Sequence, residues 1–458
     1  MLRRLTVAVL GFASAAVPAA AQTSRADRIA LMDSIAESPV LEGRVAGLAV
    51  AVVRGADTLL MKSYGMADLE WRIPMPVDAV FEIGSVTKQF TAAAILKLRD
   101  EGKLDLDADL SQYLPEFNTQ GNRIPVRRLL DHTSGMKGAT EMASFRTINT
   151  QDLPRDTLLD LIAAEPFDFA PGEALIYNNS AYILLGHIIA QVSGRSYEDY
   201  VETELFAKLG MARSSYCSNT DVVPSKARGY RLTREGLIQG AYTNHLWPYS
   251  AGSLCSTVGD LVTWLRALHG GRVLPEASYR TMITPAPLND GTPVRYAMGL
   301  SLIDPRGVPA IGHGGAIGSG FVSHTMYYPG EDLVVVMLVN TAGNLSPAAL
   351  ATEMVDVLLP MPPMERKPFA GDAAPLVGTY AGPARGQEMT ITVTLTGNGI
   401  AVAAGGGQPA PLAWVEGWTF RRGPTQIITF ERAGGNGAAT IMRVDGPSSH
   451  YVLRRKAQ

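Results

Sequence analysis

The sequence lacks the usual markers of several function classes. Its seven histidines form neither a His-x-x-x-His pair nor a cluster with carboxylates, which argues against a metal site. It has no P-loop, no Gly-x-Gly-x-x-Gly loop and no serine in a Gly-x-Ser-x-Gly frame. A formal charge of −3 without any basic run gives no indication of nucleic-acid binding. We therefore expect a protein without a metal site or a nucleic-acid partner.

Apolar runs long enough to span a membrane are also missing, and the first residues have a different pattern. Met1-Leu2-Arg3-Arg4 forms a short basic head, residues 5–18 are mostly apolar, and Ala19-Ala20-Ala21 resembles a cleavage site. The apolar part is shorter than the roughly 20 residues of a spanning helix. The pattern predicts a secretory signal peptide over 1–21 and a periplasmic or secreted protein without a stable membrane anchor.

Cysteine is nearly absent, with only Cys217 and Cys255 in the chain. In an exported protein an even number of cysteines favours a disulfide, and the alternative is two separate buried thiols. We favour a disulfide with a structural role, because closing a loop of this size typically contributes about 2–4 kcal/mol.

The order of predicted elements divides the mature chain into two domains. Predicted strands lie near both ends of residues 22–359, and the segments between them have helical spacing. The terminal strands are expected to pair in one antiparallel sheet, with helices on its faces and an inserted helical region. Five prolines mark a linker over 360–375, and short alternating strands predict a small all-β domain over 376–458.

The strongest candidate for chemistry is Gly84-Ser85-Val86-Thr87-Lys88, at the start of a helix predicted over 85–101. Residues three apart on a helix share a face, so the Ser85 hydroxyl is expected near the Lys88 amine. Serine is a poor nucleophile without an adjacent base, and a lysine becomes a base if burial lowers its pKa. Unpaired N–H groups in the first turn can bind an oxyanion. The pattern favours Ser85 as the nucleophile.

This pattern is weak on its own. Ser134-Gly135-Met136-Lys137 is a second copy, in a glycine-containing loop. Ser85 can also be interpreted as a helix cap followed by a solvated lysine. The choice between these readings depends on further motifs.

Tyr177-Asn178-Asn179 precedes a strongly apolar helix predicted over 180–193. A tyrosine hydroxyl beside the serine can relay a proton to a leaving group, and the Asn179 side chain can bind both Lys88 and a substrate carbonyl. The alternative for Tyr177 is a half-buried aromatic residue, and Tyr242-Thr243-Asn244 repeats the pattern.

His313-Gly314-Gly315 precedes a strand predicted over 321–328. Glycines there let a substrate lie against a strand edge, and the N–H of Ala316 is a candidate second oxyanion donor. The alternative is a structural histidine. His269-Gly270-Gly271 repeats the pattern at the end of a helix predicted over 260–268.

Taken in order, the three motifs resemble those of the class C β-lactamase and penicillin-binding-protein-like serine hydrolase superfamily. Its Ser-x-x-Lys, Tyr-x-Asn and Lys/His-x-Gly elements match 85–88, 177–179 and 313–315, and the likeness extends over 27–358. The resemblance implies a β-lactamase/transpeptidase-like α/β fold, an antiparallel sheet flanked by helices plus a helical subdomain. It also implies acylation of Ser85 without metal or cofactor. The C-terminal module resembles the lipocalin-like β domains of such hydrolases.

One departure bears on the substrate. Position 313 is histidine where β-lactamases usually carry lysine, and histidine is mostly neutral near pH 7. We therefore predict an acyl hydrolase, either an esterase or an enzyme for small D-amino-acid amides or peptides. The alternatives are a β-lactamase, a D-alanyl-D-alanine carboxypeptidase, or a penicillin-binding sensor that acylates without turnover. The sequence leaves the oligomeric state open, and also whether Lys88 or Tyr177 is the acylation base.

Overall fold

The computed structural model describes residues 24–304, 307–359, 367–397, 399–423, 425–432 and 437–457. The predicted signal peptide over 1–21 and the part of the predicted linker over 360–366 lie outside these ranges. Within them, no helix combines the length and apolar character needed to cross a bilayer.

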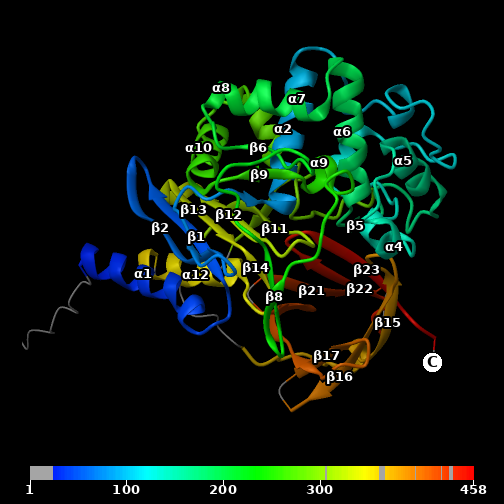
Figure 1. The fold of residues 1–458 in the computed structure, drawn as a ribbon. Helices are drawn as coiled ribbons and strands as arrows, with labels where there is room; N and C mark the ends of the chain where they lie inside the picture. Colours follow the sequence, from blue (N-terminus) through cyan, green and yellow to red (C-terminus); the bar gives the residue numbers. More distant parts are fainter. Residues whose placement is uncertain are drawn as a thin grey trace, which may run out of the picture.

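A seven-stranded antiparallel sheet forms the centre of the first domain (Figure 1). In this sheet a strand from the start of the domain pairs with a strand from its end, and Leu48 of the first lies opposite Val339 of the second. The predicted pairing of the terminal strands is therefore confirmed. From one edge to the other the strands are β10 (Ser301–Ile303), β11 (Ala310–Ala316), β12 (Val322–Tyr328), β13 (Leu333–Val339), β1 (Gly47–Arg54), β2 (Asp57–Asp68) and β3 (Ile73–Pro74).

Both faces of this sheet are covered by helices, which explains why β1 is buried throughout. Leu48, Val50 and Val52 point to the face covered by α1 (Arg25–Leu41) and α12 (Pro347–Leu358). Ala49 and Ala51 alternate with them and join the core under the inserted helices. On this second face β1 packs against α10 (Val258–His269), one of the inserted helices.

The helical region is inserted between β3 and β10, as the sequence predicts, and lies above the sheet in Figure 1. Two of its helices form the centre: α2 follows Ser85, and α6 follows Tyr177 and ends at Gly194 in the left-handed conformation. The helices are α2 (Thr87–Asp100), α3 (Val126–Leu130), α4 (Phe145–Ile148), α5 (Arg155–Ala164), α6 (Asn179–Ser193), α7 (Tyr197–Val201), α8 (Ala207–Leu209), α9 (Tyr249–Gly252), α10 (Val258–His269) and α11 (Glu276–Ile283).

Two small sheets join the helical region to the rest of the domain. One has the order β4 (Phe81–Glu82), β9 (Leu254–Ser256), β6 (Ser215–Tyr216); the other has β14 (Thr341–Ala342), β7 (Tyr230–Thr233), β8 (Gly236–Gln239). Cys217, just beyond β6, forms a disulfide with Cys255 of β9, and both residues are buried. The bond ties the segment that follows β6 to the strand beside the candidate serine.

Removing this disulfide is expected to lower the free energy of unfolding. The double variant Cys217→Ala/Cys255→Ala loses a cross-link that restricts the unfolded chain, which typically contributes about 2–4 kcal/mol. Urea denaturation of the wild type with and without reductant measures the loss, and the double variant should not respond to reductant. Equal stability of the oxidised wild type and the double variant would contradict this expectation.

The second domain is a nearly closed antiparallel β barrel, orange to red in Figure 1, and its interior is apolar. Its strand order is β18 (Ala410–Pro411), β17 (Gly399–Ala404), β16 (Glu388–Thr396), β15 (Gly378–Pro383), β23 (Ser449–Arg455), β22 (Ile441–Gly446), β21 (Gln426–Glu431), β20 (Thr419–Arg422) and β19 (Ala413–Glu416). The described end of the predicted linker already belongs to this body, because Phe369 packs on Trp414 and Phe420.

A strand of the first domain extends this barrel. β5 (Leu175–Ile176) pairs with β23, placing Ile176 opposite Ser449 and Leu175 opposite His450. Tyr177 is the next residue of the chain. The two domains therefore share a backbone hydrogen-bonded junction directly before one of the candidate residues.

Candidate active site

Ser85 lies in a 3₁₀ turn, Gly84–Val86, and the α-helix begins only at Thr87, so the helix predicted over 85–101 starts later than expected. The turn exists because Gly84 adopts a φ of +51°. A side chain there would also collide with β11, since a Cβ atom on Gly84 would lie 2.9 Å from the nitrogen of Ala316. Glycine thus brings the strand against the residue that carries the hydroxyl.

Lys88 is completely buried, and its amine contacts three oxygen atoms. Nζ lies 3.2 Å from Ser85 Oγ, 2.9 Å from Asn179 Oδ1 and 2.7 Å from the carbonyl oxygen of Ala251. Burial lowers the pKa of Lys88 well below its usual value, the charge of Arg385 lowers it further, and Glu141 opposes them. A neutral amine has two N–H groups and one lone pair.

Two of the three contacts are the same whether the amine is protonated or neutral. The amide and carbonyl oxygens can only accept, so two N–H groups of Lys88 donate to Asn179 and Ala251. The third contact is with Ser85 Oγ: a protonated amine donates to this oxygen, whereas a neutral amine can accept the hydroxyl proton through its lone pair. The arrangement is that of a serine already hydrogen-bonded to a base.

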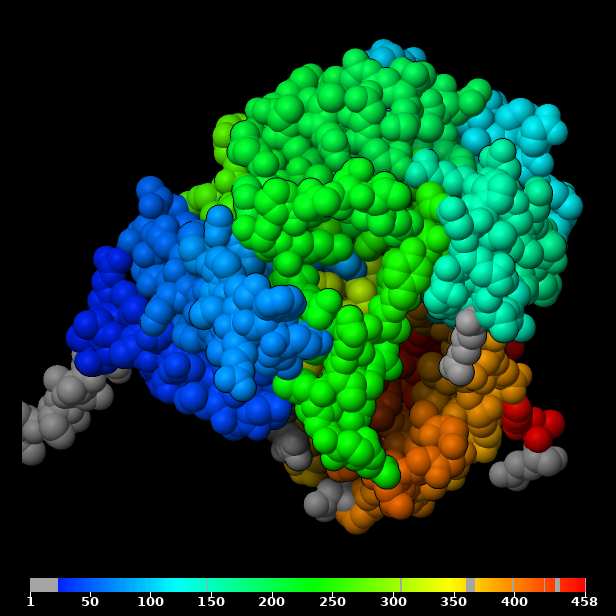
Figure 2. All heavy atoms as spheres, in the orientation of Figure 1, coloured from blue at the N-terminus to red at the C-terminus, as the bar shows by residue number. Residues whose placement is uncertain are grey.

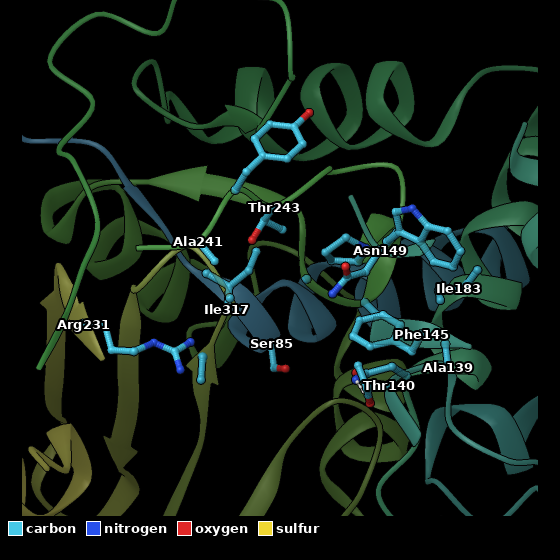
Figure 3. A pocket seen from close by; sticks show the side chains of 18 residues that line it. Ser85, Ala139, Thr140, Phe145, Asn149, Ile183, Arg231, Ala241, Thr243 and Ile317 are labelled. Atoms are coloured by element: carbon cyan, nitrogen blue, oxygen red, sulfur yellow. Dashed lines mark hydrogen bonds between the residues drawn. The ribbon is translucent and has the colours of Figure 1, made fainter. Parts of the chain in front are cut away.

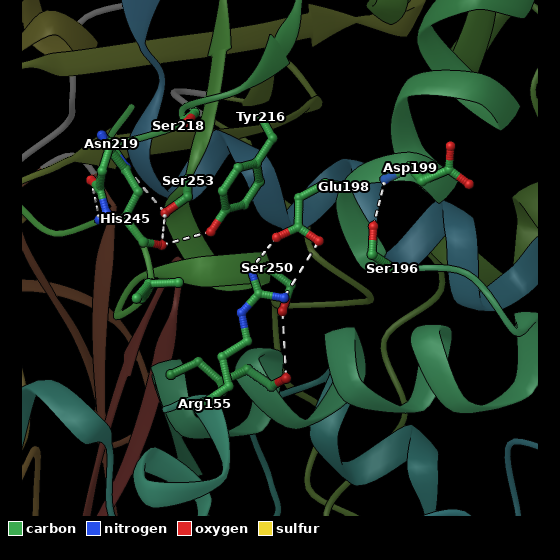
Figure 4. A network of polar contacts seen from close by, with 12 residues as sticks. Arg155, Ser196, Glu198, Asp199, Tyr216, Ser218, Asn219, His245, Ser250 and Ser253 are labelled. Atoms are coloured by element: carbon green, nitrogen blue, oxygen red, sulfur yellow. Dashed lines mark hydrogen bonds and ion pairs between the residues drawn. The ribbon is translucent and has the colours of Figure 1, made fainter. Parts of the chain in front are cut away.

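The carbonyl of Ala251 is held in place by the short helix α9 and the segments around it. Thr91 Oγ1 donates to the carbonyl of Ser250 at 2.7 Å. Ser253 Oγ and Tyr216 Oη both donate to the carbonyl of His245, at 2.9 and 2.7 Å, in the network drawn in Figure 4. These bonds fix the backbone that orients the lysine amine.

Tyr177 is positioned by β5 on one side and by the cap of α6 on the other. The Asn178 side chain accepts from the N–H of Ala181, and the N–H of Asn178 donates to Nδ1 of His132. The His132 ring packs on the Tyr177 ring with centroids 4.3 Å apart. These contacts leave the phenol ring little freedom.

The Tyr177 hydroxyl is buried and makes no hydrogen bond within the described residues. Burial raises the pKa of Tyr177, and the nearby Ser85 hydroxyl lowers it by less. The Nζ atom of Lys88 lies 4.7 Å from the centre of its ring. Tyr177 therefore presents a protonated, unpartnered phenol beside the serine and the lysine.

His313 is neutral. Its Nδ1 lies 2.5 Å from the carbonyl oxygen of Gly314, which can only accept, so Nδ1 carries the proton. Nε2 then accepts from the hydroxyl of Tyr296 at 3.0 Å. Burial, together with the Lys88 charge, lowers the pKa of His313 to about 3. The side chain is a structural anchor for β11 and provides no cation.

The backbone of β11 lies beside the serine. A Cβ atom on Gly315 would lie 3.1 Å from the nitrogen of Ser85 and 2.2 Å from the carbonyl oxygen of Ile83, so only glycine fits there. The next residue, Ala316, approaches Gly84 as described above. The amide groups of Ser85 and Ala316 thus belong to two segments in direct contact, as an oxyanion site requires.

Two cavities meet at Ser85, and both of them are also lined by Thr140, Asn179 and Ala316. The first, of about 300 Å³, is mainly apolar, and Figure 3 shows Ser85 between Phe145 on one side and Arg231 on the other. Its apolar lining includes Phe145, Ile183, Trp247, Pro248 and Ile317.

The second cavity, of about 720 Å³, contains Tyr177 and His313 and is bounded by the barrel residues Arg385, Thr425, Pro447 and Ser448. In Figure 2 the surface is hollowed between the green segment of β7 and β8 and the orange barrel. The site therefore has two mainly apolar cavities, and the second of them is shared between the domains.

The second copies of the motifs do not assemble into a second set of this kind. Lys137 forms an ion pair with Asp168 at 3.1 Å and does not contact Ser85. His269 stacks on Tyr327. The Tyr242 side chain is 61% exposed. Only the set formed by Ser85, Lys88, Tyr177, Asn179 and the 313–316 segment converges.

Several residues around this set were missed by sequence reasoning. His132, which positions Tyr177, has a φ of +61°. Its place directly before the Thr-Ser-Gly loop is the sequence signal by which it could have been found. Thr140 contacts the Asn179 amide at 3.2 Å, and Glu141 pairs with Arg385. The Ala251 carbonyl belongs to the backbone and has no sequence signature.

The fold and the site between its parts define a serine hydrolase. The model of the Beta-lactamase family matches residues 27–359, and the chain belongs to that family.

Two relatives and one solved structure illustrate the similarity. A D-aminopeptidase of Gluconobacter oxydans (strain 621H) is 29% identical over 336 residues, 73% of this chain and 62% of that protein, so the chain spans less than two thirds of its length. A D-aminopeptidase of Brucella canis is 30% identical over 419 residues, 89% of this chain and 74% of the relative. A structure of the D-amino acid amidase from Ochrobactrum anthropi SV3 with L-phenylalanine has a TM-score of 0.61 and 26% identity, covering 72% of this chain and 97% of that one.

Proposed function

We propose that this protein hydrolyses small amides or peptides of D-amino acids through an acyl-enzyme on Ser85. The observation that carries the proposal is the contact between the buried Lys88 amine and the Ser85 hydroxyl, at 3.2 Å, beside the unpartnered phenol of Tyr177. The names of the relatives support the substrate class.

In the acylation step Lys88 is the general base. The proton of Ser85 Oγ passes to Nζ while Oγ forms a bond to the substrate carbonyl carbon. The carbonyl oxygen becomes an oxyanion that the N–H groups of Ser85 and Ala316 bind. Asn179 holds Lys88 through Oδ1. Tyr177 is not the base in this scheme, because its raised pKa keeps the phenol protonated.

Tyr177 is the general acid for the leaving group. Its phenolic proton passes to the leaving nitrogen as the carbon–nitrogen bond breaks, and the ammonium of Lys88 returns a proton to the phenolate. A water molecule then attacks the ester on Ser85, which releases the acid and restores the hydroxyl. The barrel-side cavity, which Tyr177 lines, accommodates the leaving group in this scheme.

The acyl part of the substrate fits the other cavity. Its apolar lining, with Phe145 and Trp247, suits a large hydrophobic side chain. A free α-ammonium next to the scissile carbonyl requires a carboxylate, and Glu141 is the carboxylate whose charge acts on both Lys88 and Tyr177. A neutral His313 provides no cation for a β-lactam carboxylate, which disfavours a dedicated β-lactamase.

The test compares four chromogenic substrates: the p-nitroanilides of D- and L-phenylalanine, a p-nitrophenyl ester and a cephalosporin. We expect repeated turnover of the D-anilide, with kcat/KM well above that for the L-anilide. Hydrolysis of the ester alone would favour the esterase alternative. Labelling by a fluorescent penicillin without turnover of any substrate would favour the sensor.

Tyr177→Phe is expected to separate substrates by leaving group. Loss of the general acid should lower kcat/KM for the D-anilide by roughly 10²- to 10⁴-fold, because an amine leaves poorly without a proton. The nitrophenyl ester should lose much less, because its phenolate leaves unaided. Tyr279→Phe, on α11 and outside the two cavities at Ser85, is the matched control. Equal losses on both substrates would show that Tyr177 has another role.

A further inference from the structure

The barrel reaches into the site through the turn between β15 and β16. Gly386, in this turn, has a φ of +68°, and a Cβ atom on it would lie 2.5 Å from Cβ of Glu141. The neighbouring Arg385 donates from Nη2 to Glu141 Oε1 at 2.5 Å and to Thr140 Oγ1 at 3.5 Å. A residue of the second domain is thus in contact with residues of the hydrolase cleft.

Other contacts fix this turn relative to the cleft. β23 pairs with β5, as described above. Arg295 donates to Asp445 at 2.5 Å, and Arg443 forms an ion pair with Asp290 at 2.7 Å. The barrel therefore has several attachments to the first domain, and Arg385 has a defined position at the cavity that contains Tyr177.

The Arg385 guanidinium has N–H groups that can bind a ligand. Its guanidinium carbon lies 5.4 Å from the centre of the Tyr177 ring, and its side chain is 44% exposed. Within the described residues, only Nη2 makes hydrogen bonds, so Nε and Nη1 remain available to a ligand. Among the described residues lining this cavity, Arg385 is the permanent cation, since burial lowers the pKa of His313 to about 3 and that of His324 to about 4.

We propose that Arg385 of the barrel binds the carboxylate of the leaving amino acid, so that the preferred substrates are dipeptides with a D-amino acid at the amino end. This inference rests on the proposed function and adds the chemistry of the leaving group. In such a dipeptide the ammonium is next to the scissile carbonyl and the carboxylate is one carbon beyond the leaving nitrogen. Glu141 and Arg385, which form an ion pair with each other, match these two charges.

The test compares D-phenylalanylglycine with D-phenylalanylglycine amide, which lacks only the negative charge, using the whole chain. The wild type should prefer the free dipeptide in kcat/KM. Arg385→Gln should lower kcat/KM for the dipeptide about tenfold relative to the amide, a moderate value because the guanidinium is partly solvated. The loss of the Arg385 charge also changes the pKa of Lys88. This change affects both substrates alike, so it cancels in the ratio of their kcat/KM values.

Three controls distinguish the outcomes. Arg385→Lys should restore part of the preference, and Arg454→Gln, on the exposed surface of the same barrel, should not change it. Two outcomes would overturn the role of Arg385 but not the proposed function. One is an equal loss of kcat/KM for the dipeptide and for its amide in Arg385→Gln. The other is a wild type that cleaves D-phenylalanine amide but has the same kcat/KM for the dipeptide and its amide. Absence of turnover of D-phenylalanine amide and of both dipeptides would overturn the proposed function as well.

Discussion

Ser85→Ala is expected to lower kcat/KM on every substrate by at least about 10⁴-fold, because no acyl-enzyme can form without the hydroxyl. The residual rate would reflect binding and the oxyanion site alone. Burst kinetics with the nitrophenyl ester should also disappear, since the burst measures acylation. The folded state should be retained, because Ser85 Oγ contacts only the Lys88 amine among the hydrogen bonds of the described side chains.

The second Ser-x-x-Lys sequence provides the matched control. Ser134 is buried and its hydroxyl makes no hydrogen bond within the described residues, so Ser134→Ala should keep both the fold and the activity. Full activity in Ser85→Ala, or its loss in Ser134→Ala, would refute the assignment of the nucleophile.

Lys88→Met is expected to lower kcat/KM by roughly 10³- to 10⁴-fold while the protein stays folded. Methionine fills a similar volume and suits a fully buried position, but it cannot accept the serine proton. The carbonyl of Ala251 and the amide of Asn179 lose a donor, so a modest decrease in thermal stability is also expected. Lys97→Met, on the same helix, is the matched control. Comparable losses in both variants would contradict a special role for Lys88.

The pH profile gives a second measure of the same group. Below the pKa of Lys88 the amine is protonated and cannot act as a base, so kcat/KM should rise with pH through that pKa. Burial places the pKa well below 10.5, and the midpoint of this limb should therefore lie below that value. Arg385→Gln should move the midpoint upward, since the charge of Arg385 lowers the pKa. A limb centred near 10.5 would show that the amine is not desolvated.

The sequence predicts the parts of this molecule that depend on local spacing. The helix after Tyr177 and the pairing of the terminal strands follow from periodicity and the order of the predicted elements. Ser85, Lys88 and Tyr177 are recognisable because their motifs are short and ordered along the chain. Even here the 3₁₀ turn at Ser85 escaped prediction, because it depends on the contact between Gly84 and Ala316.

What the sequence could not predict depends on contacts between distant segments. Glu141 and Arg385 lie 244 positions apart, and neither belongs to a motif. Nor does any pattern in Leu175 or Ile176 indicate that a strand of the other domain pairs with them. Such contacts depend on how the two folded domains pack against each other. The residues that determine this packing are distributed over both domains and form no local sequence pattern.

The pairing of β5 with β23 determines at which point of synthesis the active site can be completed. A ribosome makes Ser85, Lys88 and Tyr177 long before it makes β23, the strand that pairs with β5 next to Tyr177. Until then the backbone groups of Leu175 and Ile176 that face β23 have only water as a partner, and nothing from the barrel fixes the entry to Tyr177. A nascent chain therefore contains the reactive groups early, but the support for the phenol is added only after β23 has been made.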